Sequence, residues 1–283
     1  MTTPNTTVRT DIDEIIPLII YPAARDAAEF GAPLPQIIQP YDISGKPGKS
    51  LSIPKWAALA DAIEVDEGED YGDFEKMTTT ESTFTPTKKK KGVIVTDEAI
   101  EDANEDVLKR AGRKIGISVA RKDDKDAIAL FTGVTTHTQG GTTSALTASM
   151  FMDGITDLEM QPVDDLNELK FAHSPKVLNV LKKELLQNSN YGVWQPLIDS
   201  ELARKFRMGE FLGVKCVPDG HIAYTSYAVG CMWHDEAFGR VKKSALTIVK
   251  ERKESADCWI LYGKQRYVYG EVEDGYAVKF TNQ

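Results

Sequence analysis

The stretch TDEAIEDANEDVLKRAGRKIGISVARKDDKDAIALFTG, residues 96–133, decides the fold because it has a start, an apolar stripe and a stop. Thr96 is a preferred N-cap, and Asp97 and Glu98 place negative charge in the first turn, where the free N–H groups favour it. Gly133 is a typical C-terminal stop. Apolar residues recur mostly every third or fourth position, at Ile100, Ala103, Val107, Ala111, Ile115, Val119, Ile128 and Phe131. We predict one long structural helix of roughly 50 Å. Residues of low helix propensity allow a kink within it, at Gly112, Gly116 and Ser118.

The composition describes a folded protein without a nucleic-acid-binding signature. At 283 residues, with 41% hydrophobic and 27% charged residues, the chain can bury a substantial core. The net charge of −9 argues against direct nucleic-acid binding, since such proteins neutralise phosphates with Lys and Arg. The N-terminus has neither a basic region nor an apolar run long enough for a signal peptide or a membrane span. Three scattered cysteines, Cys216, Cys231 and Cys258, predict buried thiols in a reducing compartment.

The first 75 residues contain two segments that cannot form a core of their own. Residues 1–45 are an arm, polar at first and then apolar with repeated prolines, which we expect to lie across another part of the protein. Residues 46–75 begin with the alternating pattern GKPGKSLSIPKW and end in a tract with seven acids between Glu64 and Glu75. Such a segment buries too little surface to offset the entropy of ordering it. We therefore expect it to be mobile, or to be held by a neighbouring molecule.

Residues 76–95 favour β-structure, because the run is rich in Thr and ends in β-branched residues. The lysines at 88–91 within it resemble a nucleic-acid-binding patch. In so acidic a chain, we interpret them as part of a solvated strand or turn that protects a sheet edge. If they bind anything, the acidic tract 64–75 of another copy is the candidate partner.

Beyond residue 133 the pattern mixes helices and short strands up to about residue 239, and it is β-rich from there on. The middle part shows helix patterns at 150–160 and from Pro175, and strand patterns at 169–172 and 224–233. This mixture predicts an α/β or α+β domain. The runs ALTIVKER, ADCWILYG and KQRYVYGEV are predicted strands, and EDG at 273–275 predicts a hairpin turn before YAVKFTN. We expect the C-terminal strands to complete one sheet on which the long helix packs.

The titratable residues show no catalytic motif. The four histidines lack metal-binding spacing, and neither a paired cysteine motif nor a nucleophile elbow is present. His234-Asp235-Glu236 is interpreted as an ordinary surface loop, because adjacent side chains point in different directions. We therefore assign no catalytic, cofactor-binding or metal-binding residue and predict no enzymatic activity. The alternative from another functional class is a metal-dependent hydrolase that uses His173, His221 and His234.

Four stretches carry a resemblance to a known family: VIVTDEAIEDA, FAHSPKVLNVLKKE, GEFLGVKCV and AYTSYAVGCMWHDEAFG. These stretches, and the order of arm, acidic excursion, long helix, mixed domain and β-rich end, resemble the major capsid protein of tailed double-stranded DNA bacteriophages. The resemblance implies the Hong Kong 97-type capsid fold, an α+β fold. Its parts would be an N-terminal arm (1–45), an extended E-loop hairpin (46–75), a discontinuous P-domain (76–133 and 240–283) and an A-domain (134–239).

The resemblance also implies a function and partners. The chain would be a major capsid protein that assembles in the host cytoplasm into hexamers and pentamers of an icosahedral virion shell around the double-stranded DNA genome. No cofactor, membrane or sequence-specific DNA contact is implied, and there is room for separate scaffolding, portal and decoration proteins. An encapsulin-type nanocompartment shell protein is the alternative with the same fold. Candidate subunit-contact residues are Lys49, Leu51, Ile53, Trp56, Glu67, Glu69, Asp70, Lys88, Lys89, Lys90 and Lys91.

Overall fold

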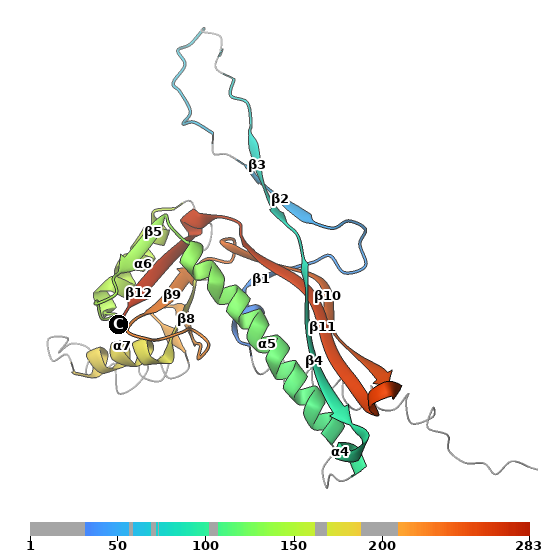
Figure 1. The fold of residues 1–283 in the computed structure, drawn as a ribbon. Coiled ribbons are helices and arrows are strands. Elements are labelled where there is room, and N and C mark those ends of the chain that lie inside the picture. Colours follow the sequence, from blue (N-terminus) through green and yellow to red (C-terminus); the bar gives the residue numbers. More distant parts are fainter. Residues whose placement is uncertain are drawn as a thin grey trace, which may run out of the picture.

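The computed structural model describes residues 32–56, 59–68, 72, 74–101, 107–161, 169–187 and 209–283. Figure 1 shows an elongated body that contains a long helix, α5 (Val107–Gly133), and a hairpin that projects away from the body. In the described residues the strands form a four-stranded sheet, a six-stranded sheet and the two-stranded hairpin. The predicted α+β fold class is confirmed.

The four-stranded sheet, in the order β1-β10-β11-β4, is built on two long strands. β10 (Phe238–Lys253) and β11 (Cys258–Glu271) pair antiparallel and are joined through the turn η3 (Glu254–Ala256). β1 (Gln39–Asp42) pairs parallel with β10, and β4 (Thr87–Thr96) pairs antiparallel with β11. The lysine run at 88–91 therefore lies on an edge strand, which confirms that part of the prediction.

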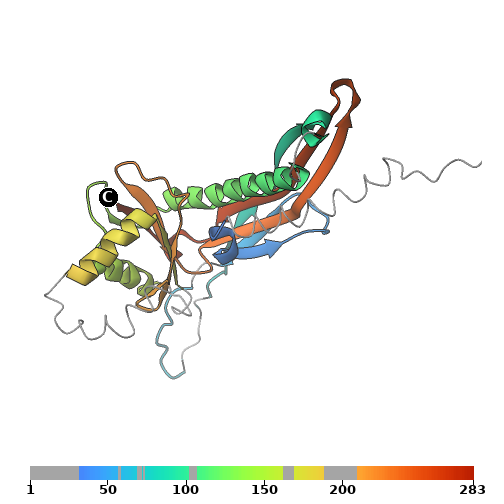
Figure 2. The same ribbon diagram turned by 90° about the horizontal axis from the view of Figure 1, so that it is seen from below.

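Helix α5 packs on one face of this sheet, as predicted, and Figure 2 shows it running along the long strands. Their shared core contains Val95, Ala111, Ile115, Val119 and Leu261. Gly263 of β11 permits this close packing, because a β-carbon there would lie 2.6 Å from Ile115 Cγ2. β11 continues through Gly263 as one strand, where the sequence predicted two, because Gly263 pairs with both neighbouring strands, opposite Ile248 and Lys91.

The start and end of the predicted helix are confirmed, with one gap between them. Ala99 N donates a hydrogen bond to Thr96 Oγ1 at 3.4 Å at the start of α4 (Asp97–Glu101), and α5 ends at Gly133. α5 is a single helix through the three positions where a kink was allowed, and two of them, Gly112 and Gly116, are buried. Residues 102–106, between α4 and α5, lie outside the described residues, so the continuity of the whole helix stays a prediction.

The six-stranded sheet lies beyond the end of α5 and carries the largest core. In sheet order its strands are β5 (His137–Gly140), β12 (Ala277–Asn282), β9 (Ala228–Trp233), β6 (Lys170–His173), β8 (Val214–Pro218) and β7 (Glu210–Phe211). Helices α6 (Ala148–Glu159) and α7 (Pro175–Gln187) accompany it, so the predicted helices and strands of the middle part are confirmed. The largest fully buried side chains of this core are aromatic, namely Phe131, Phe151, Phe171, Trp233, Phe238, Tyr267 and Phe280.

The C-terminal strand departs from the prediction. The EDG segment forms the short 3-10 turn η4 (Asp274–Tyr276), and β12 then pairs with β9 and β5 instead of folding back on β11. The Asp274 carboxylate accepts hydrogen bonds of 2.6–3.2 Å from the backbone and hydroxyl groups of Thr135 and Thr136, which directly follow α5. The predicted hairpin is therefore wrong, and the C-terminal strands are divided between two sheets.

The N-terminal part of the described chain crosses the body before it forms the hairpin. The short helix α3 (Leu34–Ile37) is held on α5 by a hydrogen bond from Leu34 N to Asp124 Oδ1 at 3.3 Å. Leu34 is fully buried, so this end of the arm packs across the body as expected. β2 (Leu51–Trp56) then pairs antiparallel with β3 (Thr79–Phe84). The hairpin includes residues 79–84, beyond the predicted E-loop, and the domain boundaries stay predictions.

Candidate subunit interface

The base of the hairpin is fixed by the chain itself. Leu51 and Ile53 of β2 are half-buried against a small core of Ile43, Phe84 and Val241, which joins the hairpin to the four-stranded sheet. Lys55 Nζ also pairs with Glu273 Oε2 at 3.4 Å. Two of the predicted contact residues, Leu51 and Ile53, therefore anchor the hairpin within the subunit. Their contact with another subunit stays a prediction.

The outer part of the hairpin exposes large apolar side chains. Trp56 is 64% exposed and Phe74 is 83% exposed, and the same part of the chain exposes Leu59, Ile63, Val65 and Met77. A hydrogen bond from Ala60 N to Glu75 Oε2 at 2.8 Å connects its two sides. Scattered exposed apolar residues are ordinary, but so many on one projecting loop are typical of an interaction surface.

Sequence reasoning selected only part of this surface. Trp56 was predicted and is exposed, as are the predicted Lys49 and Glu67. Glu69 and Asp70 lie outside the described residues. The other exposed apolar residues were missed because they are scattered among acids without a helix or strand period. The available signal was the presence of single bulky apolar residues in an acidic tract, because a tract without a core cannot bury them itself.

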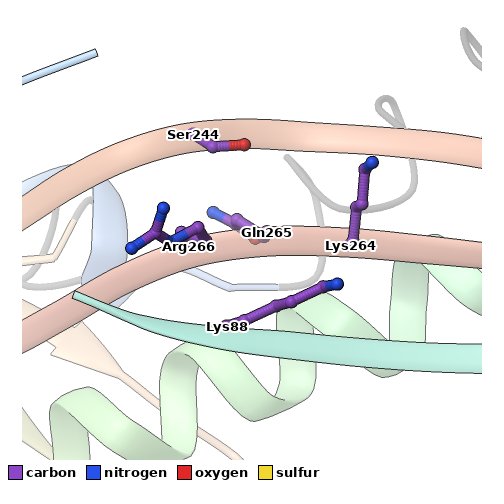
Figure 3. A pocket seen from close by; sticks show the side chains of 5 residues that line it. All are labelled: Lys88, Ser244, Lys264, Gln265 and Arg266. Atoms are coloured by element: carbon purple, nitrogen blue, oxygen red, sulfur yellow. The ribbon is translucent and has the colours of Figure 1, made fainter. Parts of the chain in front are cut away.

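A basic surface covers the face of the four-stranded sheet opposite α5. Opposite positions of an antiparallel pair share a face, and the register places Lys88 opposite Arg266 and Lys90 opposite Lys264. Figure 3 shows Lys88, Lys264 and Arg266 around an open pocket of about 510 Å³ that Ser244 and Gln265 also line. Among the described residues, none of the four cations of this basic surface (Lys88, Lys90, Lys264 and Arg266) has an ion-pair partner.

The four consecutive lysines do not act as one patch. Because side chains alternate along a strand, Lys89 turns toward α5, where its Nζ lies 3.5 Å from Asp126 Oδ2. Lys90 lies on the other face, with its Nζ 3.4 Å from the centre of the Tyr262 ring, in a cation–π contact. Lys88 and Lys90 are thus available on the outer face, whereas Lys89 is already paired inside the subunit.

The histidines are not gathered into the site that the hydrolase alternative requires. His173 is fully buried, and burial lowers its pKa to about 4. His234 is also buried, with its backbone N–H bonded to Tyr276 O at 3.0 Å, so the interpretation of a surface loop is wrong for this residue. In the described part of the chain, the group of possible metal ligands that contains His221 includes neither of the other two.

The three cysteines lie inside the subunit. Cys216, Cys231 and Cys258 are free and buried, as predicted, and burial raises the pKa of Cys216 to about 12. Among the described helices, none combines the length and the apolar character needed to cross a membrane.

The fold is shared with solved structures of phage and virus-like particles. A structure of Mycobacterium phage Che8 is 14% identical, with a TM-score of 0.70 over 88% of this chain and 90% of its own. The capsid of Myoviridae phage XM1 is 14% identical, with a TM-score of 0.63 over 88% and 91%. The virus-like particle from Pyrococcus furiosus is 12% identical, with a TM-score of 0.61 over 94% and 98%. These similarities place the fold in the class of shell-forming capsid proteins.

Within that class of fold, a match to a protein family identifies the family of this chain. Residues 79–220, half of the chain, match the family described as phage capsid protein, and the chain belongs to this family. No curated protein matches the chain significantly. The predictions of a phage major capsid protein and of the Hong Kong 97-type fold are confirmed. The chain is a structural protein of the virion that associates with its own copies into a shell, and the family match favours this function over an encapsulin.

Proposed function

We propose that the subunit assembles into hexamers and pentamers in which each hairpin reaches over a neighbouring copy. The observation that carries this proposal is the projecting β2–β3 hairpin, whose outer part exposes large apolar side chains and contributes no described residue to a buried core. A subunit whose loop meets a different surface on the next copy makes head-to-tail contacts, and such contacts close into rings.

The basic surface is the proposed partner of the hairpin's acidic tract. The described acids of this tract, Glu64, Asp66, Glu67 and Glu75, are exposed. Lys88 and Lys90 face Arg266 and Lys264, and like charges directly opposite each other destabilise a sheet unless an external anion balances them. Charge complementarity between two surfaces speeds and orients their association more than it adds affinity. We therefore expect these charges to align the hairpin, while Trp56 and Phe74 supply the buried area.

Charge reversal tests this contact. In Lys88→Glu/Lys90→Glu, we expect the assembled fraction, measured by gradient sedimentation and negative-stain microscopy, to fall by at least about tenfold. Adding Glu64→Lys/Glu67→Lys to the same chain should restore part of the assembly. The matched control is Lys183→Glu/Lys215→Glu, which reverses two exposed lysines elsewhere. Equal assembly of both double variants would refute the contact.

The remaining parts of the proposed function concern the contents and partners of the shell. We propose that the shell assembles in the host cytoplasm, encloses double-stranded DNA without sequence-specific contacts, and acts together with separate scaffolding, portal and decoration proteins. The net charge of −9 supports weak contact between the wall and DNA, and the buried thiols suit a reducing compartment. The subunit has no enzymatic role in this proposal. Nuclease-resistant DNA in purified particles is the expected result, and particles filled with cargo protein would favour the encapsulin alternative.

A further inference from the structure

Three side chains of types that can ligate a metal meet where helix α5 contacts the loop after β8. Asp124 lies on α5, and Asp219 and His221 lie in the loop that follows β8. Asp124 Oδ2 is 2.7 Å from His221 Nδ1, and Asp219 Oδ1 is 3.5 Å from the same nitrogen. One ligand atom from each residue lies within 4.8 Å of the other two. The fold thus brings together donors that are up to 97 residues apart in the sequence.

The cluster contains two buried carboxyl groups, and the protein around them does not balance the charge that both would carry when ionised. Asp124 and Asp219 are 0% and 1% exposed, and their carboxyl groups lie within hydrogen-bonding reach of each other. Asp219 Oδ1 accepts the backbone N–H of His221, but Asp219 Oδ2, also buried, has no hydrogen-bond donor among the described residues. With both carboxyl groups ionised, even a protonated His221 would leave one negative charge uncompensated; this is costly in the interior, and burial beside Asp219 raises the pKa of Asp124 accordingly.

The neighbouring Asp123, also a buried acid on α5, has partners within the chain that Asp124 and Asp219 lack. Its carboxylate is fully satisfied by Arg240 Nη2 at 2.5 Å and by the hydroxyl of Tyr269 at 2.7 Å. Within the described part of the chain, no Lys or Arg pairs with Asp124 or Asp219. A cation from outside the chain could take the place that Arg240 has beside Asp123.

We propose that Asp124, Asp219 and His221 bind a divalent transition-metal ion, with Zn²⁺ the best-suited ion. Two carboxylates and one imidazole suit Zn²⁺, whereas Ca²⁺ and Mg²⁺ prefer oxygen ligands alone. The His221 side chain is 28% exposed, which gives the ion a path to the site and leaves room for a water as a fourth ligand.

The bound ion would act as a clamp between parts of the subunit. It would tie α5 to the loop after β8 and, because Leu34 N donates to Asp124 Oδ1, would also hold the end of the N-terminal arm. An ion that binds only the folded chain raises its thermal stability in proportion to the logarithm of the free ion concentration. The role is structural and is independent of which surfaces join the subunits.

The test uses the full-length chain after treatment with EDTA. Titration with Zn²⁺ in a calorimeter should show one ion per chain, and the melting temperature should rise with Zn²⁺ and fall back with EDTA. Asp219→Asn, which keeps the size of the side chain, should weaken Zn²⁺ binding by more than about tenfold. His137→Ala removes a histidine outside the cluster and should bind Zn²⁺ as the wild type does.

Two results would overturn the proposal. One is a wild-type chain that takes up no Zn²⁺ and melts at the same temperature with and without it. The other is binding that survives in Asp219→Asn and is lost in His137→Ala, since the ion would then occupy an adventitious histidine site. If Asp219→Asn fails to fold, the absorption spectrum of the Co²⁺-loaded wild type decides: nitrogen and oxygen ligands in a four-coordinate site give intense visible bands, and their absence refutes the site.

Discussion

The ring of Phe84 lies directly on Gly270, where a β-carbon on residue 270 would come within 1.8 Å of Phe84 Cε1. Phe84 is the last residue of β3, and Gly270 is in β11, so this contact joins the hairpin to the sheet. Phe84 is buried in the small core that also contains Ile43 and Val241. The contact sets the direction in which the hairpin leaves the body, because it is formed at the hairpin's base.

Gly270→Ala should destabilise the subunit and loosen the hairpin. The added methyl group overlaps the Phe84 ring, and overpacking of this kind costs about 1–3 kcal/mol. The free energy of unfolding, measured with urea, should fall by that amount, and shells should form less efficiently. Gly92→Ala is the matched control, since a β-carbon on this β4 residue meets its nearest atoms at 3.5 Å. Equal stability of the two variants would contradict the packing argument.

Asp123→Ala should be among the most destabilising substitutions on α5. It leaves the guanidinium of Arg240, whose side chain is only 16% exposed, without its carboxylate partner. Removing one member of a buried ion pair costs about 3–5 kcal/mol. Denaturant unfolding measures the loss, and Asp123→Ala/Arg240→Met should recover part of it because the unpaired charge is gone.

Lys122→Ala provides the comparison for Asp123→Ala. Lys122 pairs with Asp126 at 2.6 Å on the same helix, but its side chain is 54% exposed. An exposed pair contributes about 0–1 kcal/mol. If the free energy of unfolding fell by the same amount in both variants, burial would not make the Asp123–Arg240 pair more important than an exposed pair.

The sequence predicted features whose signals are local. Thr96 and Gly133 mark the beginning and end of the long helix because an N-cap hydroxyl and a terminal glycine act within one turn. The lysines at 88–91 indicated an edge strand for a similar reason, since charge protects an unpaired edge. These inferences need no knowledge of which distant segments meet.

Long-range contacts explain what the sequence did not predict. Asp123 and Asp124 stand in the polar run RKDDKD, which is typical of a solvated helix face, yet both are buried. Their partners Arg240 and His221 are 117 and 97 residues away. The sequence likewise predicted a hairpin turn at Asp274, because Thr135 and Thr136, which bind its carboxylate, are 139 and 138 residues away in the sequence.

Acid should destabilise the subunit through His173. Its ring is fully buried, and Nδ1 accepts the backbone N–H of Ser174 at 2.8 Å, which requires a neutral ring. Burial lowers the pKa of His173 to about 4, below the value of about 6.5 expected in the unfolded chain. The unfolded state therefore binds the proton more tightly, so this stabilisation is present above pH 6.5 and is lost as the pH falls toward 4. The total loss is about 3 kcal/mol.

Urea unfolding between pH 7 and pH 4 measures this dependence. His173→Gln should be less stable at neutral pH but should lose less stability on acidification than the wild type. His137→Gln, which changes a half-buried histidine, should keep the wild-type pH dependence. A His173→Gln variant with the wild-type slope would show that another group is responsible.

Assembly should protect the outer part of the hairpin from hydrogen exchange. In the isolated subunit, residues 59–68 are exposed and belong to no helix or strand, so their amides should exchange within seconds. If a neighbouring copy covers Trp56 and Phe74 in the shell, exchange of these amides should slow by at least about tenfold, because binding limits access of water. Mass spectrometry of peptides from subunits and shells measures this directly.

Peptides from β11 should be protected in both states because the strand is paired on both sides. Equal exchange of residues 59–68 in subunit and shell would mean that the hairpin reaches no neighbour.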